Sequence, residues 1–492
     1  MTAASDSSPR YQFGPLQRRG LIAGWRGGQI GAVAAGLVVA VAVLRAKPSV
    51  AGVVVGVGAL GVGVAFATWP LGGRTAEEWT PDVLRHLTRS GGGRTGSFDP
   101  FRGIQLIQVA LTDDRPAKGR AATQDAESAE GCFVGAGVLH DRARRTFTAV
   151  LSASAPGFVL LGEQDRAGRV GAWAGVLASL ARDGSAVHRV QWLERVSEED
   201  GAAARRYVRA EAVRPRGDLA RDSYESLLDT ELGSSSRHDV FLAVSIHTGH
   251  ANRAIRVLGG GATGACALLL REVAALRRRL TDASIDVGAV LGAPEVVGIF
   301  RDAYDSAARP SDVATVTSRG PGWPWPMGIA AEWSRLRADD TWHATYWIAE
   351  WPRTEVSSDF MGPLLLSSEV RRTVSVVMEP QGPLKAARKV EQARTADIAD
   401  AELRRRGGFL ATARRRREEE LLAHVEAELA EGHAPYRFSG YVTVSAASPE
   451  ALEEASGRVE QAAGQAGLEL RRCYGDQAYA FTCTLPLGRG LS

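Results

Sequence analysis

The chain has 492 residues, and 59 Lys and Arg against 56 Asp and Glu give it a formal net charge of +3. This near-neutral balance provides no overall basic surface of the kind that holds nucleic acid, so nucleic-acid binding is not expected. The length predicts roughly two to three soluble domains beside any membrane segment.

Residues 1–15 are polar and are predicted to be flexible. Two apolar runs follow, Gly27–Leu44 and Ser49–Trp69, and neither contains an acidic or basic side chain. Each is close to the ~20 residues that a helix needs to cross hydrocarbon, whereas a signal peptide has one shorter run. Gly and Val are poor helix formers in water, but lipid tolerates Gly because it enforces internal hydrogen bonding. The sequence therefore predicts a cytoplasmic segment, 1–27, and a transmembrane helical hairpin, 28–69.

Small residues spaced four apart, Gly31 with Ala35 and Gly52 with Gly56, are expected to pack this hairpin on itself rather than to form a dimer motif. Basic residues are denser on both flanks than in the turn, and the positive-inside rule then puts both ends in the cytoplasm of a two-span inner-membrane protein. Membrane lipid is the first expected partner. The residues expected at the membrane interface are Trp25, Arg26, Arg45, Lys47, Trp69 and Arg74.

Residues 70–97 are expected to form an amphipathic juxtamembrane helix, beginning at Arg74, and a linker. The next region, 98–236, is predicted to be a first α+β domain. Its expected elements are a strand at 104–111, a loop at 112–130, a hairpin of strands at 132–139 and 145–154, a helix at 162–182, a strand at 187–196 and a polar helical segment at 197–236.

The region 237–492 is predicted to be a second α+β domain. Its expected elements are strands at 239–247, 285–291, 342–350 and 372–378, helices at 264–282 and 294–308, and a long helical hairpin at 384–431. The last part reads as strand 438–444, helix 449–464 and strands 468–473 and 478–485, about half of a ferredoxin-like unit. Strands that alternate with helices predict an α+β fold with mixed sheets.

No complete catalytic, cofactor or metal motif is found in the sequence, so we expect a protein that is not an enzyme and has no cofactor. The run Gly259–Gly264 has the ends of a phosphate loop, but Ala265 stands where Lys should contact phosphate. His247 and His250 have no third metal ligand nearby. The run Arg414–Arg417 is explained by i,i+4 pairs with the following Glu residues, although weak nucleic-acid contact by this arm stays open.

The four cysteines form no C-x-x-C pair, which gives no support to zinc or thioredoxin-type chemistry, and buried free thiols are expected. Six of the 11 Trp residues crowd between Trp323 and Trp351, and Arg353 follows. Large aromatic side chains with Arg are typical of interaction surfaces, but they also fill cores. The candidate interaction residues are Trp347, Trp351, Arg353 and Arg371.

The stretches 346–353, 371–380, 432–444 and 485–491 resemble the E-type core component of the actinobacterial type VII (ESX) secretion membrane complex. Members of that family also place two spans before a cytoplasmic domain. The specific stretches lie within 340–491, and residues 98–330 resemble the family only loosely. The resemblance implies a structural role in a hetero-oligomer with other secretion-complex membrane subunits, beside a separate hexamer-forming ATPase.

The leading hypothesis is therefore a non-enzymatic membrane scaffold component of a type VII-like secretion complex. Two alternatives stay open. One is an anchor subunit of a type IV-like, conjugation-related system, because two spans followed by Gly73–Trp79 are similar to its small two-span subunits. The other is a membrane-bound nucleotide-dependent enzyme.

Overall fold

The computed structural model describes residues 27–46, 48–71, 74–75, 101–112, 115–116, 135–154, 158–198, 236–305, 325–367, 370–386 and 434–491, together with isolated positions such as Tyr11, Phe13, Thr80 and Val83. Most of the predicted loop 112–130, of the polar segment 197–236 and of the helical hairpin 384–431 lies outside the described residues. Of the Trp-rich stretch 323–351, the residues from Trp325 onward are described.

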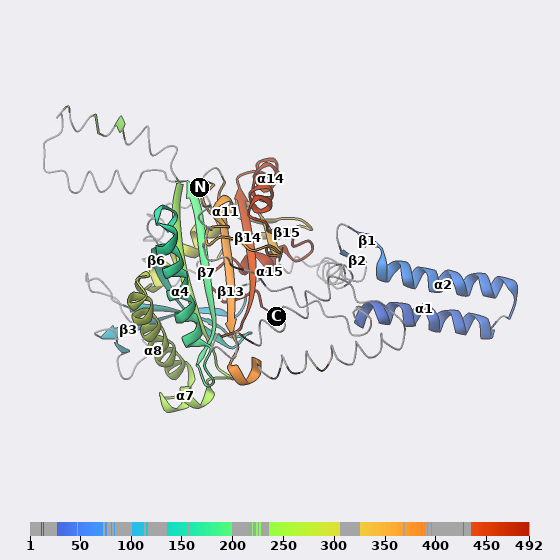
Figure 1. Cartoon of the computed structure of the whole chain (residues 1–492), viewed down its shortest axis with the longest axis horizontal. Coiled ribbons are helices and arrows are strands. Elements are labelled where there is room, and N and C mark those ends of the chain that lie inside the picture. Colours follow the sequence, from blue (N-terminus) through green and yellow to red (C-terminus); the bar gives the residue numbers. More distant parts are fainter. Residues whose placement is uncertain are drawn as a thin grey trace, which may run out of the picture.

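The N-terminal apolar runs form two antiparallel helices, α1 (Gly27–Ala46) and α2 (Val50–Thr68). Ser49 caps α2, since its hydroxyl accepts a hydrogen bond from the Gly52 N–H at 3.2 Å. The hairpin projects away from the rest of the molecule (Figure 1). Both helices are long and apolar enough to cross a membrane, as the sequence predicts.

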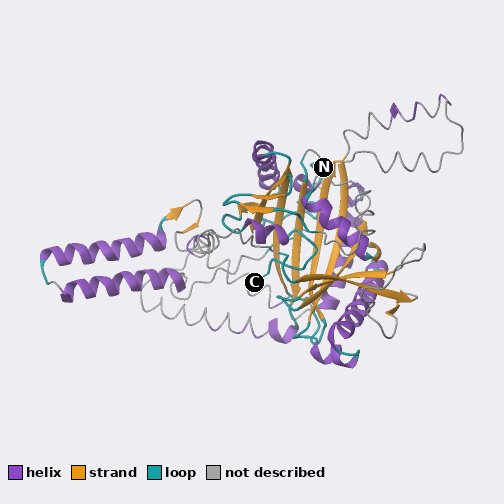
Figure 2. Ribbon diagram, turned by 180° about the vertical axis from the view of Figure 1, so that it is seen from behind, coloured by secondary structure: helices purple, strands orange, loops and turns teal. Residues whose placement is uncertain are grey.

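The remaining described residues are organised around one large sheet in the order β10-β11-β12-β14-β13-β7-β8-β6-β5-β3-β4, with β15 on β12 and β9 on β6. The strands are β3 (Ile104–Thr112), β4 (Arg115–Pro116), β5 (Gly135–Asp141), β6 (Thr146–Ser154), β7 (Val187–Glu198), β8 (Ser236–His247), β9 (Asp286–Val290), β10 (Ile329–Ala331), β11 (Leu336–Ala338), β12 (Thr341–Glu350), β13 (Arg372–Pro380), β14 (Tyr436–Ala446) and β15 (Glu469–Arg472). Figure 2 shows these strands in orange with helices packed against them.

Every strand pair among the described residues is antiparallel, so the expectation of a mixed sheet is wrong. The reason lies in the helical crossovers. Helix α4 (Glu163–Leu180) joins β6 to β7, and β8 lies between these two strands and pairs with both. In the same way α14 (Pro449–Gln465) joins β14 to β15, with β12 between them. Both crossovers have the split β-α-β order of ferredoxin-like folds.

The predicted domain boundary at 236 and 237 falls at the first residues of β8. The strands on both sides of this boundary belong to the same sheet, because β8 pairs with β7 from Ser236 opposite Glu198 to Ile246 opposite Val187, and β7 also pairs with β13. The backbone hydrogen bonds of the sheet are thus continuous from the first predicted α+β region into the second.

Successive strand residues point to opposite sides of the sheet, and both sides are covered by packed elements. On one face, Val138, Leu151 and Val244 pack with α4 and α8 (Gly261–Asp282). On the other face, Leu139 and Val150 pack with α9 (Ala293–Tyr304) and with the segment 478–487. A third cluster joins β12 and β14 to α14 and α11 (Gly362–Leu365). Figure 1 shows α4 and α8 on the same face of the sheet.

Two local predictions are wrong. The segment 478–485 is expected to be a strand, but α15 (Gln477–Thr482) is a helix, followed by a turn at Cys483. A strand with one buried face would bury only alternate residues of this segment. Here Ala478, Ala480 and Phe481 are all buried. The juxtamembrane helix is expected to begin at Arg74, but Arg74 and Thr75 form β2, which pairs with β1 (Pro70–Leu71); helical residues appear at Thr80 and Val83.

Candidate functional site

The contact between α1 and α2 is made by small residues. The buried residues of α2 are Gly52, Gly56, Gly63 and Ala67. A Cβ at Gly63 would lie 2.9 Å from the Ala32 carbonyl oxygen, and one at Gly36 would lie 3.1 Å from that of Ala59. The backbones therefore approach as closely as in other small-residue packing of transmembrane helices.

This geometry agrees with the expected self-packing at Gly52 and Gly56, but it moves the α1 side of the contact. Gly31 and Ala35 are exposed, whereas Gly36 and Ala40 are the buried residues of α1. Across the hairpin, the Gln29 side-chain amide donates a hydrogen bond to the Ala67 carbonyl oxygen at 2.8 Å.

The outer surface of the hairpin is apolar. Large exposed side chains on α2 include Val50, Val54, Val57 and Val62, with exposed fractions of 83%, 65%, 66% and 69%. A core helix of a soluble protein would bury such side chains, and water would penalise leaving so many of them exposed together. In hydrocarbon this surface meets a solvent of its own polarity.

Of the expected interface residues, Arg45 lies in the last turn of α1 and Trp69 follows the last residue of α2, with 64% of its surface exposed. Their positions at helix ends are those of interface-anchoring residues. Arg74 lies in β2. Trp25, Arg26 and Lys47 lie outside the described residues.

Two residues of the N-terminal segment, Tyr11 and Phe13, contact the large sheet-containing body, and the other residues of 1–15, for which flexibility is expected, lie outside the described residues. Tyr11 and Val356 exchange two backbone hydrogen bonds, of 2.9 and 3.0 Å. Two residues along, the Phe13 ring packs against Trp351, Phe360 and Phe438, with ring centroids 5.1, 5.3 and 6.3 Å away. We refer to Trp351, Phe360 and Phe438 as the aromatic socket.

The socket is built on β14 and on the segment between β12 and α11, which holds Trp351 and Phe360. Phe438 belongs to β14, and Trp351 lies edge-on to it with centroids 5.2 Å apart. Gly440, on the same face of β14, makes room for this arrangement, because a Cβ there would meet Trp351 Cζ2 at 3.0 Å and Ile348 Cδ1 at 2.5 Å. Phe438 remains 39% exposed with Phe13 in place.

The other candidate interaction residues lie in different environments. The Trp347 indole donates a hydrogen bond to the Ser439 hydroxyl at 3.1 Å, and the Arg353 side chain is 80% exposed beside Glu350. Arg371 is 16% exposed and pairs with Asp302. The Trp residues do not fill one core: Trp325 stacks on Phe101, whereas Trp342 and Trp351 border the cluster between β12 and α14.

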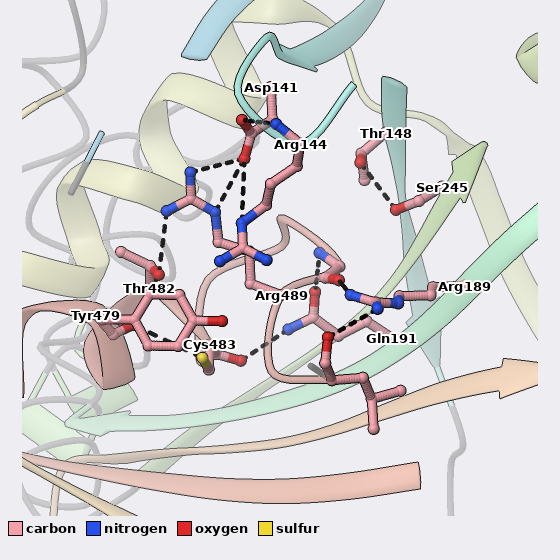
Figure 3. A network of polar contacts seen from close by, with 12 residues as sticks. Asp141, Arg144, Thr148, Arg189, Gln191, Ser245, Tyr479, Thr482, Cys483 and Arg489 are labelled. Carbon is pink, nitrogen blue, oxygen red and sulfur yellow. Dashed lines mark hydrogen bonds and ion pairs between the residues drawn. The ribbon is translucent and has the colours of Figure 1, made fainter. Parts of the chain in front are cut away.

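Sequence reasoning missed a second feature, the way in which the segment 477–491 is fastened to the sheet (Figure 3). Arg489 donates two hydrogen bonds to Asp141 Oδ2, at 2.7 and 3.1 Å, and both side chains are almost fully buried. Arg489 also contacts the Thr482 hydroxyl at 3.2 Å. A buried pair of this kind needs such close geometry, because both ions lose their hydration.

Two side chains of β7 hold the backbone of the same segment. Arg189 donates to the carbonyl oxygens of Gly488 and Leu491, at 3.1 and 2.8 Å. The Gln191 amide lies 2.9 Å from the carbonyl oxygens of Cys483 and Leu485 and accepts from the Gly488 N–H at 2.7 Å. These contacts satisfy backbone groups that a sheet or helix does not pair. We refer to Asp141, Arg189 and Gln191, with the segment they hold, as the polar clamp.

Glycine is required inside the clamp. Gly488 has a φ of 64°, and Gly490 has a φ of 117°, a region that side chains with a Cβ rarely adopt. A Cβ at Gly490 would lie 2.6 Å from the ring of Tyr441, whose hydroxyl donates to the Gly490 carbonyl oxygen at 2.9 Å.

The glycine run 259–264 forms a corner between α7 (Asn252–Val257) and α8. Gly259, Gly260 and Gly261 all have positive φ angles. A Cβ at Gly264 would lie 2.4 Å from the Ile255 carbonyl oxygen, so this residue allows the two helices to touch. The pattern that resembles a phosphate loop thus has a packing explanation.

The structure brings His188 to the His247–His250 pair, with ring centroids 4.7 to 5.4 Å apart. Burial and the neighbouring Arg189 lower the pKa of His188 to about 4, and burial also lowers the pKa of His247, so both are neutral at pH 7. Within the described part of the chain, no group of three His, Cys, Asp or Glu side chains is arranged to hold a metal ion.

Cys266 and Cys483 are buried free thiols, and Cys473 is a half-buried one. Burial raises the pKa of the Cys266 thiol to about 11 and that of Cys483 to about 12. A protonated, buried thiol is a poor nucleophile, so these residues act as small core side chains. Cys132 lies outside the described residues.

Comparison with known proteins gives one family. The model of the EccE family, described as a type VII ESX secretion system translocon, matches residues 234–348, from the start of β8 into β12. The match lies mostly in the region whose sequence resembles that family only loosely, and it overlaps the more specific stretches only at 346–348. No curated protein matches the chain. Together with two helices that have the length and composition of membrane spans, this match supports an EccE-type identification of the chain.

Proposed function

We propose that this protein is a non-enzymatic membrane scaffold component of a type VII-like secretion complex, with its soluble body at the cytoplasmic face beside a separate ATPase. The observation that carries the proposal is the contrast in one chain between the apolar outer surface of the α1–α2 hairpin and a large body with a filled core. The family match favours a type VII system over a type IV-like anchor.

The docking of the N-terminal segment supports the proposed topology. Tyr11 and Phe13 precede the hairpin, and the body that they contact follows it. Segments that touch lie on the same side of a bilayer, so two spans between them are consistent with this contact. The turn between α1 and α2 has fewer basic residues than the two flanks of the hairpin. By the positive-inside rule, this supports the cytoplasm as the side on which both flanks lie. In this topology, Trp25, Arg26, Arg45, Lys47, Trp69 and Arg74 anchor the two ends of the helices at the lipid headgroups.

A scaffold needs surfaces that bind other subunits. Trp347, Trp351, Arg353 and Arg371 remain our candidates, and the exposed guanidinium of Arg353 supports a direct contact best. Confinement to the membrane raises the local concentration of partners, so that weak contacts suffice. Other secretion-complex membrane subunits and their ATPase are the partners we propose.

The test is affinity purification of the full chain from solubilised membranes of cells that carry the complete secretion system. Recovery of other secretion membrane subunits with the chain is expected, and Arg353→Glu is expected to reduce it. Arg353→Lys, which keeps the charge, is the matched control. Recovery of no other secretion subunit would overturn the scaffold role.

A further inference from the structure

We propose that Phe13 and the aromatic socket form a second tether, by which the chain's own N-terminal segment fixes the orientation of the soluble body relative to the membrane. This inference rests on the proposed membrane anchoring of the α1–α2 hairpin. The socket is thereby assigned an occupant, Phe13 of the same chain, with Tyr11 bound beside it.

The contact has two independent parts. The backbone bridge between Tyr11 and Val356 fixes the direction of the segment, as in the addition of a strand to a sheet edge. The Phe13 ring then fits between three aromatic rings, in tilted and edge-on arrangements that aromatic pairs favour. Gly440 leaves the space that the Trp351 ring occupies, because the side chain of any larger residue would displace this ring.

Chain length makes this contact restrictive. From Phe13 to Gly27, the first residue of α1, the chain can span at most about 50 Å. The second connection begins at α2 with the paired strands β1 and β2, and from Thr75, the last residue of β2, to Phe101 it can span at most about 90 Å. The N-terminal connection is thus the shorter of the two, and it limits how far the body can move from the bilayer.

The two connections also reach the body at different places. The socket consists of Phe438 of β14 and of Trp351 and Phe360, which follow β12, whereas the second connection leads into β3. Five strands separate β14 from β3 in the sheet, β13, β7, β8, β6 and β5. Six inter-strand steps amount to about 29 Å. A body held at two such points cannot rotate freely about either of them.

Disulfide trapping tests the contact in the full-length protein in its membranes. Residues that exchange both backbone hydrogen bonds across an antiparallel bridge have Cα atoms about 5.5 Å apart, within the range of a disulfide. The double variant Tyr11→Cys/Val356→Cys is therefore expected to form an intramolecular disulfide on mild oxidation. The single variants measure the background from the native cysteines, and Tyr11→Cys/Val257→Cys, with an exposed residue on α7, is the matched control.

The outcomes separate the proposal from its rivals. Adding Phe13→Ala should lower the yield of the disulfide roughly fivefold, the effect of about 1 kcal/mol from the aromatic contacts, and Phe13→Tyr should restore it. A disulfide-linked dimer would overturn the proposal, because the segment would then serve a second copy. A yield no higher than that of the single variants would also overturn it.

Orientation needs its own measurement. With a donor dye at Leu160→Cys, which is 90% exposed, and acceptor dyes on lipid headgroups, the distribution of transfer efficiencies should broaden when Phe13→Ala is added. An unchanged distribution would overturn the tether role even if the disulfide forms. Trapping and energy transfer do not involve other secretion subunits, so a failure of the scaffold role alone would leave both results intact.

Discussion

The α1–α2 hairpin and the polar clamp solve the same problem, holding two segments together, with opposite choices of residue. In the hairpin, small residues face inward and Val, Leu and Phe face outward. In the clamp, leucines face inward and a buried ion pair and buried amide hold the backbone. The difference in residue choice matches the solvent of each region, lipid for the hairpin and water for the body. Lipid gives no reward for hiding large apolar side chains, whereas water does.

The clamp should be the most sensitive part of the molecule. Arg489→Met leaves the Asp141 carboxylate buried beside Arg144, whose Nε lies 3.8 Å from it. Removal of one partner of a buried pair costs about 3–5 kcal/mol of unfolding free energy. Denaturant unfolding of the detergent-solubilised chain measures this loss. Arg353→Met is the matched control, because its exposed pair with Glu350 should cost less than about 1 kcal/mol. Equal losses in the two variants would contradict the comparison.

The hairpin should be sensitive to an increase in side-chain size on its inner face only. Gly63→Val places atoms where a Cβ is already 2.9 Å from the Ala32 carbonyl oxygen, whereas Gly58→Val meets nothing within 4 Å. Overpacking of a tight contact costs about 1–3 kcal/mol. Hydrogen–deuterium exchange of α1 and α2 in detergent should be faster in Gly63→Val and unchanged in Gly58→Val. If both variants exchange at the same rate, small residues do not hold the hairpin together.

The water-facing body should lose stability in acid. His343 is fully buried between Ser445 and the Tyr304 carbonyl oxygen, and burial lowers its pKa to about 3. In the unfolded chain the pKa of this imidazole is near 6.5, so the unfolded state takes up a proton first as the pH falls. The stability that neutral His343 contributes is therefore fully present above about pH 6.5 and is lost progressively toward pH 3. This one residue should cost about 2 kcal/mol at pH 5.

Thermal unfolding at pH 7 and pH 5 measures this effect. His343→Gln should show a smaller decrease in Tm between the two pH values than the unmodified chain, whatever its Tm at pH 7. Between pH 7 and pH 8 neither protein should change, which is the internal control. A decrease in Tm as large in His343→Gln as in the unmodified chain would assign the acid sensitivity to other groups, such as His188.

The sequence predicts most elements because their periodicity is set by local burial. The strands 104–111 and 239–247 and the helix 264–282 have clear apolar faces, and the structure contains β3, β8 and α8 there. It cannot predict α15, since residues buried on every side carry no period. The direction of the sheet is missed as well, because a helix between strands gives no sign that β8 inserts between β6 and β7.

The candidate site is predictable only where it depends on composition. The hairpin follows from apolar content, but its inner face on α1 is Gly36 and Ala40 rather than Gly31 and Ala35, because helix rotation depends on the partner. The aromatic socket and the polar clamp join residues that lie hundreds of positions apart, such as Phe13 with Phe438 and Asp141 with Arg489. A single sequence contains no local signal for such contacts.

The smallest expected effect is that of replacing Gln29 in the hairpin, and the matching replacement in the clamp is that of Gln191. Gln29 makes a hydrogen bond across the hairpin, and Gln191 makes several inside the clamp. Gln29→Met should cost only about 0.6 kcal/mol, since hydrogen bonds between membrane helices are weak on average and the freed carbonyl oxygen of Ala67 lies near the end of α2. Gln191→Met should cost several times more, because it leaves the Gly488 N–H and two carbonyl oxygens buried without this partner. Exchange rates in α1 and α2 measure the first variant, and denaturant unfolding of the body measures the second. If Gln29→Met were as damaging as Gln191→Met, polar contacts would hold the hairpin as they hold the clamp, and the two regions would not differ by solvent.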